Sequence, residues 1–375
     1  MVILTEERID AVRRAIPALD EDPTVNCYWV TGSVTAGLGT PASDLDVTVV
    51  TSDDPGRVPG GIRRGQYWVD SRRVDVNVQP VAWLRQLVDS VGSYVACSMD
   101  TGQLYTPEPV LKAVAQLHAG VRIVKDSTEF AGVRSALHRG EIDFRRLLIA
   151  RAAMCSHNTQ EDLAGFIADG DFDSAVLRAR DLLMFGLDAW TVACGEPYPG
   201  NKWLWRRLNR VLTDADALSF IRDMLLPGSA VAASDFSYLH RVNTLNQTLL
   251  TQALLRCWSV KPREAADPVI PDMAADGVWR TPGWSLNRTV DQWCLGDRRS
   301  AFATPVTAAI CWAFANGLPP EVLVETVIER SATWFEIKIT QVTAVSLVTK
   351  LTEIGAVAVG HLTAVADQFY AHDAA

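Results

Sequence analysis

Two short segments of this chain alternate strictly between polar and apolar residues, and both carry acidic side chains at polar positions. The first is DLDVTV at residues 44–49, and the second is RVDVNVQ at residues 73–79. Successive side chains of a β-strand point to opposite faces, so Asp44, Asp46 and Asp75 would lie on polar faces and the intervening apolar residues on buried ones. The pattern predicts two half-buried strands whose open faces carry carboxylates.

The three carboxylates would converge if these strands were neighbours in one sheet. Uncompensated anions at close range repel one another, which raises their pKa values and favours a bound cation. Carboxylate oxygens suit a hard divalent ion, and two such ions about 3.5–4 Å apart form a clamp for phosphoryl or nucleotidyl transfer. The pattern therefore predicts a hard divalent ion held by Asp44, Asp46 and Asp75, unless Arg73, on the same face, tethers Asp75 instead.

The apolar run at residues 25–30 is followed by Gly32 and Ser33 and then by further small, turn-forming residues. Small residues at a strand exit let a phosphate approach backbone N–H groups near the positive end of a short helix or turn. Gly32 and Ser33 are therefore candidate ligands of a triphosphate.

The segment GSVTAGLGTPASDLD, followed by Asp75 on a later strand, resembles the polymerase-β-like nucleotidyltransferase superfamily, and within it most closely the antibiotic (aminoglycoside-type) enzymes. The resemblance covers about the first 80 residues closely. It implies that Gly32 and Ser33 hold nucleotide phosphates, that Asp44 and Asp46 bind the metals, and that Asp75 ligates a metal or deprotonates the acceptor. D-x-D alone is common, so the indication comes from the conjunction of these features.

The resemblance also implies a nucleotide or substrate role for Lys202, which lies in a Lys-Trp stretch of a later helical region. The residues themselves allow a second interpretation, in which Trp203 belongs to the core and the basic residues form a solvated face. In such enzymes a carboxylate of the helical domain can act as acceptor base. Asp181 and Asp188 are mildly preferred here over Glu141 and Asp143.

The distribution of strand and helix signals predicts an α+β chain of three domains. Strands at 25–30, 45–50, 66–69 and 74–78, with a helix at 5–18, indicate a small mixed-sheet catalytic domain over 1–125. Helical patterns dominate a second domain at 126–260, and the proline-interrupted segment 261–273 is the best linker. Three helices in 268–375 resemble a winged-helix or PqqD-like module, for which packing or dimerisation is favoured over DNA binding.

Composition narrows the class of protein further. The chain has 375 residues, a net charge of −9 and seven scattered cysteines without a C-x-x-C pair. The negative charge disfavours nucleic-acid binding, and the cysteine pattern suggests neither a disulfide framework nor a zinc site. No long apolar span or targeting segment is evident, so we expect a cytoplasmic protein without membrane contact.

The leading hypothesis is Mg²⁺-dependent transfer of a nucleoside monophosphate from an NTP, with ATP favoured, to a hydroxyl of a small molecule, with release of pyrophosphate. One alternative keeps this chemistry and changes the acceptor to a protein, a peptide or a tRNA end. Another is a non-catalytic nucleotide-binding protein of the same fold. The presence of all three aspartates speaks against the last, and a homodimer with a shared cleft is left open.

Overall fold

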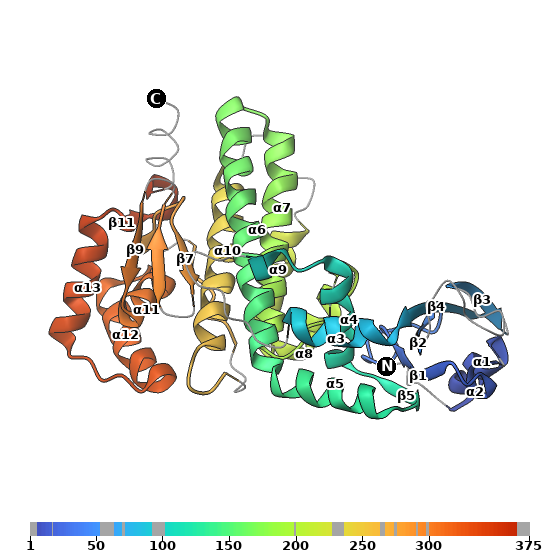
Figure 1. Cartoon of the computed structure of the whole chain (residues 1–375). Coiled ribbons are helices and arrows are strands. Elements are labelled where there is room, and N and C mark those ends of the chain that lie inside the picture. Colours follow the sequence, from blue (N-terminus) through green and yellow to red (C-terminus); the bar gives the residue numbers. More distant parts are fainter. Residues whose placement is uncertain are drawn as a thin grey trace. The chain divides into compact units, whose positions relative to one another are not determined.

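The computed structural model describes residues 6–16, 18–52, 64–69, 72–91, 102–198, 200–226, 236–262, 267–273, 276–289, 292–297 and 300–365, and all structural statements concern these residues (Figure 1). Four strands contain the sequence-predicted ones, namely β1 (Val25–Thr31), β2 (Leu45–Thr51), β3 (Gly65–Val69) and β4 (Arg72–Pro80). A fifth, β5 (Arg122–Lys125), was not predicted. The helices around them are α1 (Glu6–Ala15), α2 (Ala18–Glu21), α3 (Val81–Val91), η3 (Gly102–Tyr105), α4 (Glu108–Ala119) and α5 (Thr128–Arg139).

The following elements are mainly helical, and strands return near the C-terminus. The helices are α6 (Glu141–Asp169), α7 (Phe172–Ala193), η4 (Asn201–Trp203), α8 (Leu204–Val211), α9 (Ala215–Leu225) and α10 (Phe236–Cys257). After them come β6 (Asp276–Arg280), β7 (Ser285–Arg288), β8 (Trp293–Gly296), β9 (Ala301–Thr304), α11 (Val306–Phe314), β10 (Asn316–Leu318), α12 (Pro320–Phe335), α13 (Gln341–Glu353) and β11 (Val357–His361). This order confirms the α+β class.

The chain divides into two compact units, which are described separately. The first unit comprises Met1–Tyr94, Tyr105–Phe144 and Glu196–Arg206, and the second comprises Val95–Leu104, Arg145–Gly195 and Arg207–Ala375. The finer division into three domains stays a prediction. Among the residues described, no helix combines the length and the apolar character that crossing a membrane requires.

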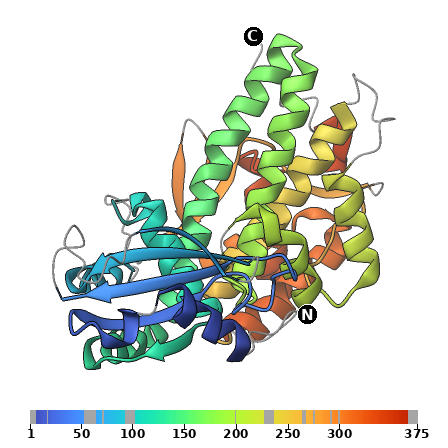
Figure 2. The ribbon, with the colours of Figure 1, turned by 90° about the vertical axis from the view of Figure 1, so that its right-hand side faces the viewer.

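A five-stranded mixed sheet, with the order β3-β4-β2-β1-β5, forms the centre of the first unit and is drawn in blue to green in Figure 2. β2 and β4 pair in parallel, and the other neighbouring strands are antiparallel. The parallel register sets Asp46 directly beside Asp75. The two alternating segments are therefore neighbours, as convergence of their carboxylates requires.

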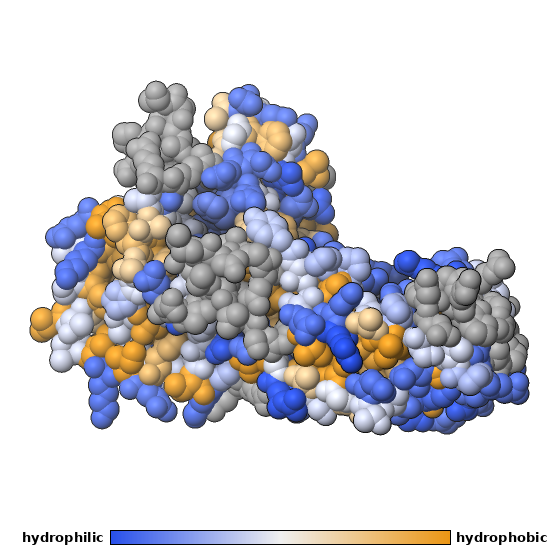
Figure 3. All heavy atoms as spheres, viewed as in Figure 1, coloured by the Kyte–Doolittle hydropathy of each residue, from blue (hydrophilic) through white to orange (hydrophobic). Residues whose placement is uncertain are grey.

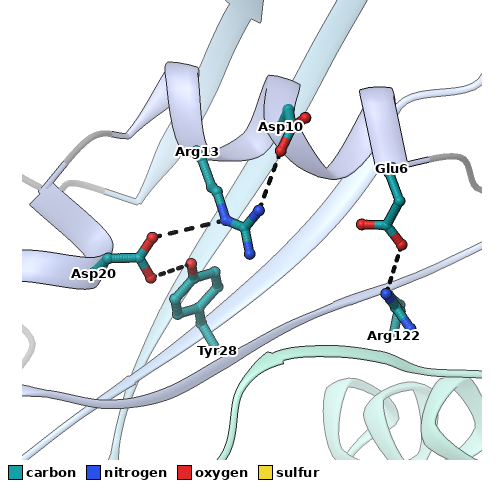
Figure 4. A network of polar contacts seen from close by, with 6 residues as sticks. All are labelled: Glu6, Asp10, Arg13, Asp20, Tyr28 and Arg122. Carbon is teal, nitrogen blue, oxygen red and sulfur yellow. Dashed lines mark hydrogen bonds and ion pairs between the residues drawn. The ribbon is translucent and has the colours of Figure 1, made fainter.

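The apolar face of this sheet packs against α1 and α2. Ile9, Val12, Ile16 and Leu19 join the buried valines of β1, β2 and β4 in one core. Polar contacts surround that core in Figure 4, where the hydroxyl of Tyr28 donates to Asp20 at 2.6 Å. α1 ends at Ala15, three residues before the end of the helix expected at 5–18. Among the described residues this face is filled, so a ligand of the carboxylates would approach from the opposite, polar face.

Helices α7 and α10 pack closely in the second unit. A Cβ atom added to Gly186 would lie 2.7 Å from Oδ1 of Asn246, so the two helices approach through a glycine. Such contact leaves no room for a larger residue at this position. The helical character predicted for this part of the chain is confirmed.

The C-terminal part of the second unit contains the three predicted helices, α11, α12 and α13, in a winged-helix-like module. The strand after α13, β11, pairs with β6, which precedes the helices. β6 pairs with β10 on its other side and so becomes the central strand of the sheet. Val322 on α12 and Val342 and Val345 on α13 are exposed apolar residues. Orange, hydrophobic surface is visible at the left of Figure 3.

Candidate active site

The parallel pair β2 and β4 positions two of the three candidate carboxylates. Asp46 and Asp75 occupy matching positions on the polar face, and Asp44 immediately precedes β2. The Asp44 and Asp75 side chains are 24% and 30% exposed, so a ligand in solvent can reach both. Alternation along the strands thus produces the predicted acidic patch.

Arg73 is the counter-charge within this patch. Its guanidinium forms a hydrogen bond and ion pair with Asp44, and its Nε atom lies 3.1 Å from Oδ1 of Asp75. The geometry of the second contact falls short of a hydrogen bond, so the buried Oδ1 atom of Asp75 has no hydrogen-bond partner among the described residues. One arginine therefore links two carboxylates and leaves an acceptor oxygen unsatisfied.

Burial and mutual repulsion disturb the acid-base behaviour of the patch. Burial, followed by the charge of Asp44, raises the pKa of Asp46 from 3.8 to about 6. Burial also raises the pKa of Asp75, an effect that Arg73 opposes and Asp44 reinforces. These directions are those expected for crowded carboxylates with too little positive charge.

In the described part of the chain, no group of three or more His, Cys, Asp or Glu side chains has the arrangement of a metal site. Within the acidic patch, the guanidinium of Arg73 contacts both Asp44 and Asp75. The carboxylates are thus compensated in part by arginine.

The turn after β1 depends on Gly32. The backbone there has a φ of +96°, and a Cβ atom at this position would lie 2.0 Å from Oδ2 of Asp46. The turn is closed by the N–H groups of Leu38 and Gly39, which both donate to the carbonyl of Ser33 at 2.7 Å. Gly32 therefore provides the space that the Asp46 carboxylate needs, in addition to its predicted role toward phosphates.

Replacing Gly32 by Ala is expected to destabilise the protein and to displace the Asp46 side chain. Gly195→Ala is a matched control, since Gly195 has a φ of +91° and its added Cβ would meet no atom within 4 Å. We expect a cost of about 1 kcal/mol in the control, from backbone strain alone, and about 2–3 kcal/mol or more in Gly32→Ala. Urea unfolding measures both. Equal losses would show that the contact with Asp46 has no energetic weight.

Lys202 lies in the first unit together with this turn. Trp203 packs in one cluster with Ala36 and Leu38 of the turn, and the Nζ atom of Lys202 lies 4.8 Å from the centre of the Trp203 ring. Arg206 donates to the carbonyl oxygens of Leu38 and Gly39, at 2.5 and 2.8 Å. Trp203 therefore belongs to the core, as the second interpretation predicted. Lys202 and Arg206 both lie against its ring. Whether Lys202 binds a ligand stays a prediction.

The sequence reasoning missed three residues of the first unit near the acidic patch. The charge of Lys112 on α4 lowers the pKa of Asp46. Burial, with a smaller contribution from the charges of Asp46 and Asp44, raises the pKa of Tyr198 to about 12, although a hydrogen bond with Gln116 opposes the rise. Lys112 and Gln116 are four residues apart on α4, a spacing that puts them on one helix face and would have been the available signal.

The two carboxylates preferred as acceptor base in the helical region are both paired. Asp188 accepts a hydrogen bond from the buried Arg207 at 2.6 Å, and Asp181 lies 3.3 Å from Arg178. The role of Asp188 supported by these contacts is structural.

Comparisons with known proteins give a limited result. The chain matches no protein-family model and no curated protein sequence. Among solved structures, it resembles a nucleotidyltransferase-like protein from Exiguobacterium sibiricum 255-15, with 14% sequence identity and a TM-score of 0.37. The alignment covers 66% of this chain and 77% of that one. A likeness of this size does not bear on substrate or residue roles, so the antibiotic type stays a prediction.

Proposed function

We propose that the protein is a nucleotidyltransferase that transfers a nucleoside monophosphate from ATP to a hydroxyl of a small molecule. The observation that carries the proposal is the parallel register that sets Asp46 beside Asp75, next to the Gly32 turn. Acidic residues in adjacent strands with a tight turn beside them are the arrangement that a nucleotide and its cations require.

The residues fit Mg²⁺ in chemistry. Asp44, Asp46 and Asp75 offer carboxylate oxygens, one of them is buried without a hydrogen-bond partner, and the raised pKa of Asp46 indicates an unmet need for positive charge. When bound there, Mg²⁺ would neutralise charge on the phosphates and on the departing pyrophosphate. Arg73 would have to release one or both of its carboxylates.

The chain's own residues account for the remaining chemistry of the transfer. The acceptor oxygen bonds to the α-phosphorus while the bond from that phosphorus to the oxygen of the β-phosphate breaks, and the electron pair leaves with pyrophosphate. In this proposal, Asp75 takes the hydroxyl proton, and Gly32, Ser33 and Lys202 hold the phosphates. Positioning of the two reactants supplies much of the rate in such transfers.

The test of this function is pyrophosphate release from ATP in the presence of Mg²⁺ and a panel of hydroxylated small molecules, with mass spectrometry of the products. We expect a product heavier than the acceptor by one AMP group. Products modified only on added protein, peptide or tRNA would favour the alternative acceptor class, and release that is insensitive to Asp46→Asn would refute the proposed site.

Replacing Arg73 by Met is expected to increase the response of the protein to Mg²⁺. Without magnesium, the three carboxylates lose their counter-charge, so the Tm should fall by several degrees; with magnesium, the stabilisation should exceed that of wild type. Arg72→Met is the control, because Arg72 alternates to the other face of β4. Differential scanning fluorimetry with and without Mg²⁺ measures the effect. Equal magnesium shifts in all three proteins would show that Arg73 does not compete with the ion.

A further inference from the structure

A cavity of about 710 Å³ lies over the polar face of the sheet in the first unit. This size is within the range of small-molecule sites, about 300–1,000 Å³. Its lining includes Asp46 and Asp75, so the cavity opens on the acidic patch. It was not predicted from the sequence, and its other lining residues indicate what kind of molecule it suits.

The strand β4 supplies the floor. Asp75, Asn77 and Gln79 alternate along it with buried valines and line the cavity. The Nε2 atom of Gln79 donates to Oδ1 of Asn77 at 3.4 Å. The amide nitrogen of Asn77 and the amide oxygen of Gln79 are then left for a ligand. An amide pair of this kind both donates and accepts, which matches hydroxyl groups, since they also do both.

Helix α4 supplies a second polar wall. Glu108, Lys112 and Gln116 recur every fourth residue and all line the cavity. The lining therefore carries positive and negative groups on the same wall. A strongly anionic molecule would meet Glu108, Asp46 and Asp75, whereas a cationic one would meet Lys112 and Arg64, which also lines the cavity. An uncharged ligand avoids both conflicts.

An aromatic ring completes the lining. Trp83 stacks with Trp29 at a centroid distance of 6.4 Å and an angle of 11°, and Trp29 in turn stacks on Phe130 at 4.0 Å. Trp29 is buried, so the stack fixes the position of Trp83. A fixed aromatic face beside amide groups suits the apolar face of a saturated ring that bears hydroxyls at its edge.

The cavity lies on the Asp75 side of the patch. The residues of the turn from Gly32 to Gly39 do not line it, whereas that turn packs with Tyr198 and Trp203. A molecule in the cavity would thus face the carboxylate proposed to take the acceptor's proton, and the phosphates would lie by the turn. We propose that the cavity binds the acceptor and that the acceptor is an uncharged, polyhydroxylated ring, a pyranose or a cyclitol. This inference rests on the proposed function and adds the acceptor's class and location.

The test is binding of glucose, galactose and myo-inositol, measured without nucleotide by saturation-transfer NMR and titration, with glucosamine and glucose 6-phosphate as charged comparators. We expect at least one uncharged ring to bind more tightly than its charged comparators. Gln79→Ala should weaken that binding at least tenfold, while Gln86→Ala, an exposed glutamine on α3 outside the cavity lining, should leave it unchanged. The affinity for α,β-methylene-ATP with Mg²⁺ should be the same in both variants.

The outcomes separate this inference from the proposed function. Absence of binding by all three uncharged rings, binding insensitive to Gln79→Ala, or tighter binding of a charged comparator would overturn the inference. A loss of nucleotide affinity in Gln79→Ala would also overturn it, by assigning the cavity to the nucleotide. Ring binding at Gln79 without any pyrophosphate release would support the cavity's ligand class and count against the proposed transfer.

Discussion

Asp46→Asn is expected to reduce nucleotidyl transfer by at least about a thousandfold while making the magnesium-free protein more stable. The loss of activity follows because a neutral amide cannot replace a carboxylate that holds a divalent ion and its nucleotide. The gain in stability follows because burial and the charge of Asp44 disfavour the ionised Asp46 carboxylate in the folded state. A substitution that lowers activity and raises stability is characteristic of a position where function requires a destabilising residue.

The direction of the Asp46 pKa shift determines how the stability difference between Asp46→Asn and wild type changes with pH. The pKa of Asp46 is raised from 3.8 to about 6 on folding, so its contribution to stability is fully present below pH 3.8 and is lost as the pH rises through about 6. The full effect of such a rise is about 3 kcal/mol, and solvent access to this half-buried group reduces it to about 1–3 kcal/mol. Asparagine cannot ionise, so Asp46→Asn does not lose this stability as the pH rises. The variant's free energy of unfolding should therefore exceed that of wild type by a margin that grows from acid toward neutral pH.

Urea unfolding in EDTA near pH 5 and near pH 8 measures this difference, with Asp89→Asn, on the exposed face of α3, as control. We expect the control to follow wild type at both pH values. If Asp46→Asn were as active as wild type, or less stable than wild type near pH 8, the account of this residue would be wrong.

Asp75→Asn is expected to lower kcat by about a hundredfold or more and to leave ATP affinity within a few-fold of wild type. Asp44 and Asp46 still hold the metal-bound nucleotide in this variant, whereas the positioned base is lost. The raised pKa of Asp75 brings it closer to the working pH, as a proton acceptor requires. Stopped-flow or steady-state kinetics with a transferable acceptor, together with nucleotide titration, would separate the two effects.

The pH–rate profile distinguishes a base from a metal ligand at Asp75. If Asp75 is the base, the wild-type rate rises through its pKa and the variant lacks that rise, so the ratio of their rates is largest at higher pH. If Asp75 is only a ligand, higher Mg²⁺ or substitution by Mn²⁺ should restore part of the activity. A wild-type kcat in Asp75→Asn would leave the ion pair with Arg73 as its sole role, a contact worth at most about 1 kcal/mol at this exposure.

The central part of the fold could be predicted because alternation is a local property. The apolar residues that alternate with Asp44, Asp46 and Asp75 determine which face of each strand is buried, and strand pairing then needs only neighbouring positions in the sheet. The observed strands contain every predicted strand and extend beyond it by one residue in β1, β2 and β3 and by two residues at each end in β4. The turn after β1 could also be predicted, because glycine is common where the backbone adopts a positive φ.

Contacts between distant segments could not be predicted in the same way. The charge of Lys112 acts on Asp46 because α4 and the sheet line the same cavity. Trp203 packs with Leu38 because residues 196–206 belong to the first unit. The tether between Arg73 and Asp75 was foreseen as one option, whereas the shared contact with Asp44 was not. The pairing of Asp188 with the buried Arg207 likewise depends on helix packing. Neither the period of the apolar residues nor the spacing of motifs along the sequence indicates which distant segments come into contact.

Isothermal titration of α,β-methylene-ATP into the protein, with Mg²⁺ and then with EDTA, tests the central claim most directly, because it needs no knowledge of the acceptor. The account predicts one nucleotide bound per chain, an affinity at least tenfold weaker without the metal, and a comparable loss in Gly32→Val, where a branched side chain would occupy the space of Asp46 and of a phosphate. No binding in the presence of Mg²⁺, or binding of equal affinity in EDTA and in Gly32→Val, would contradict it.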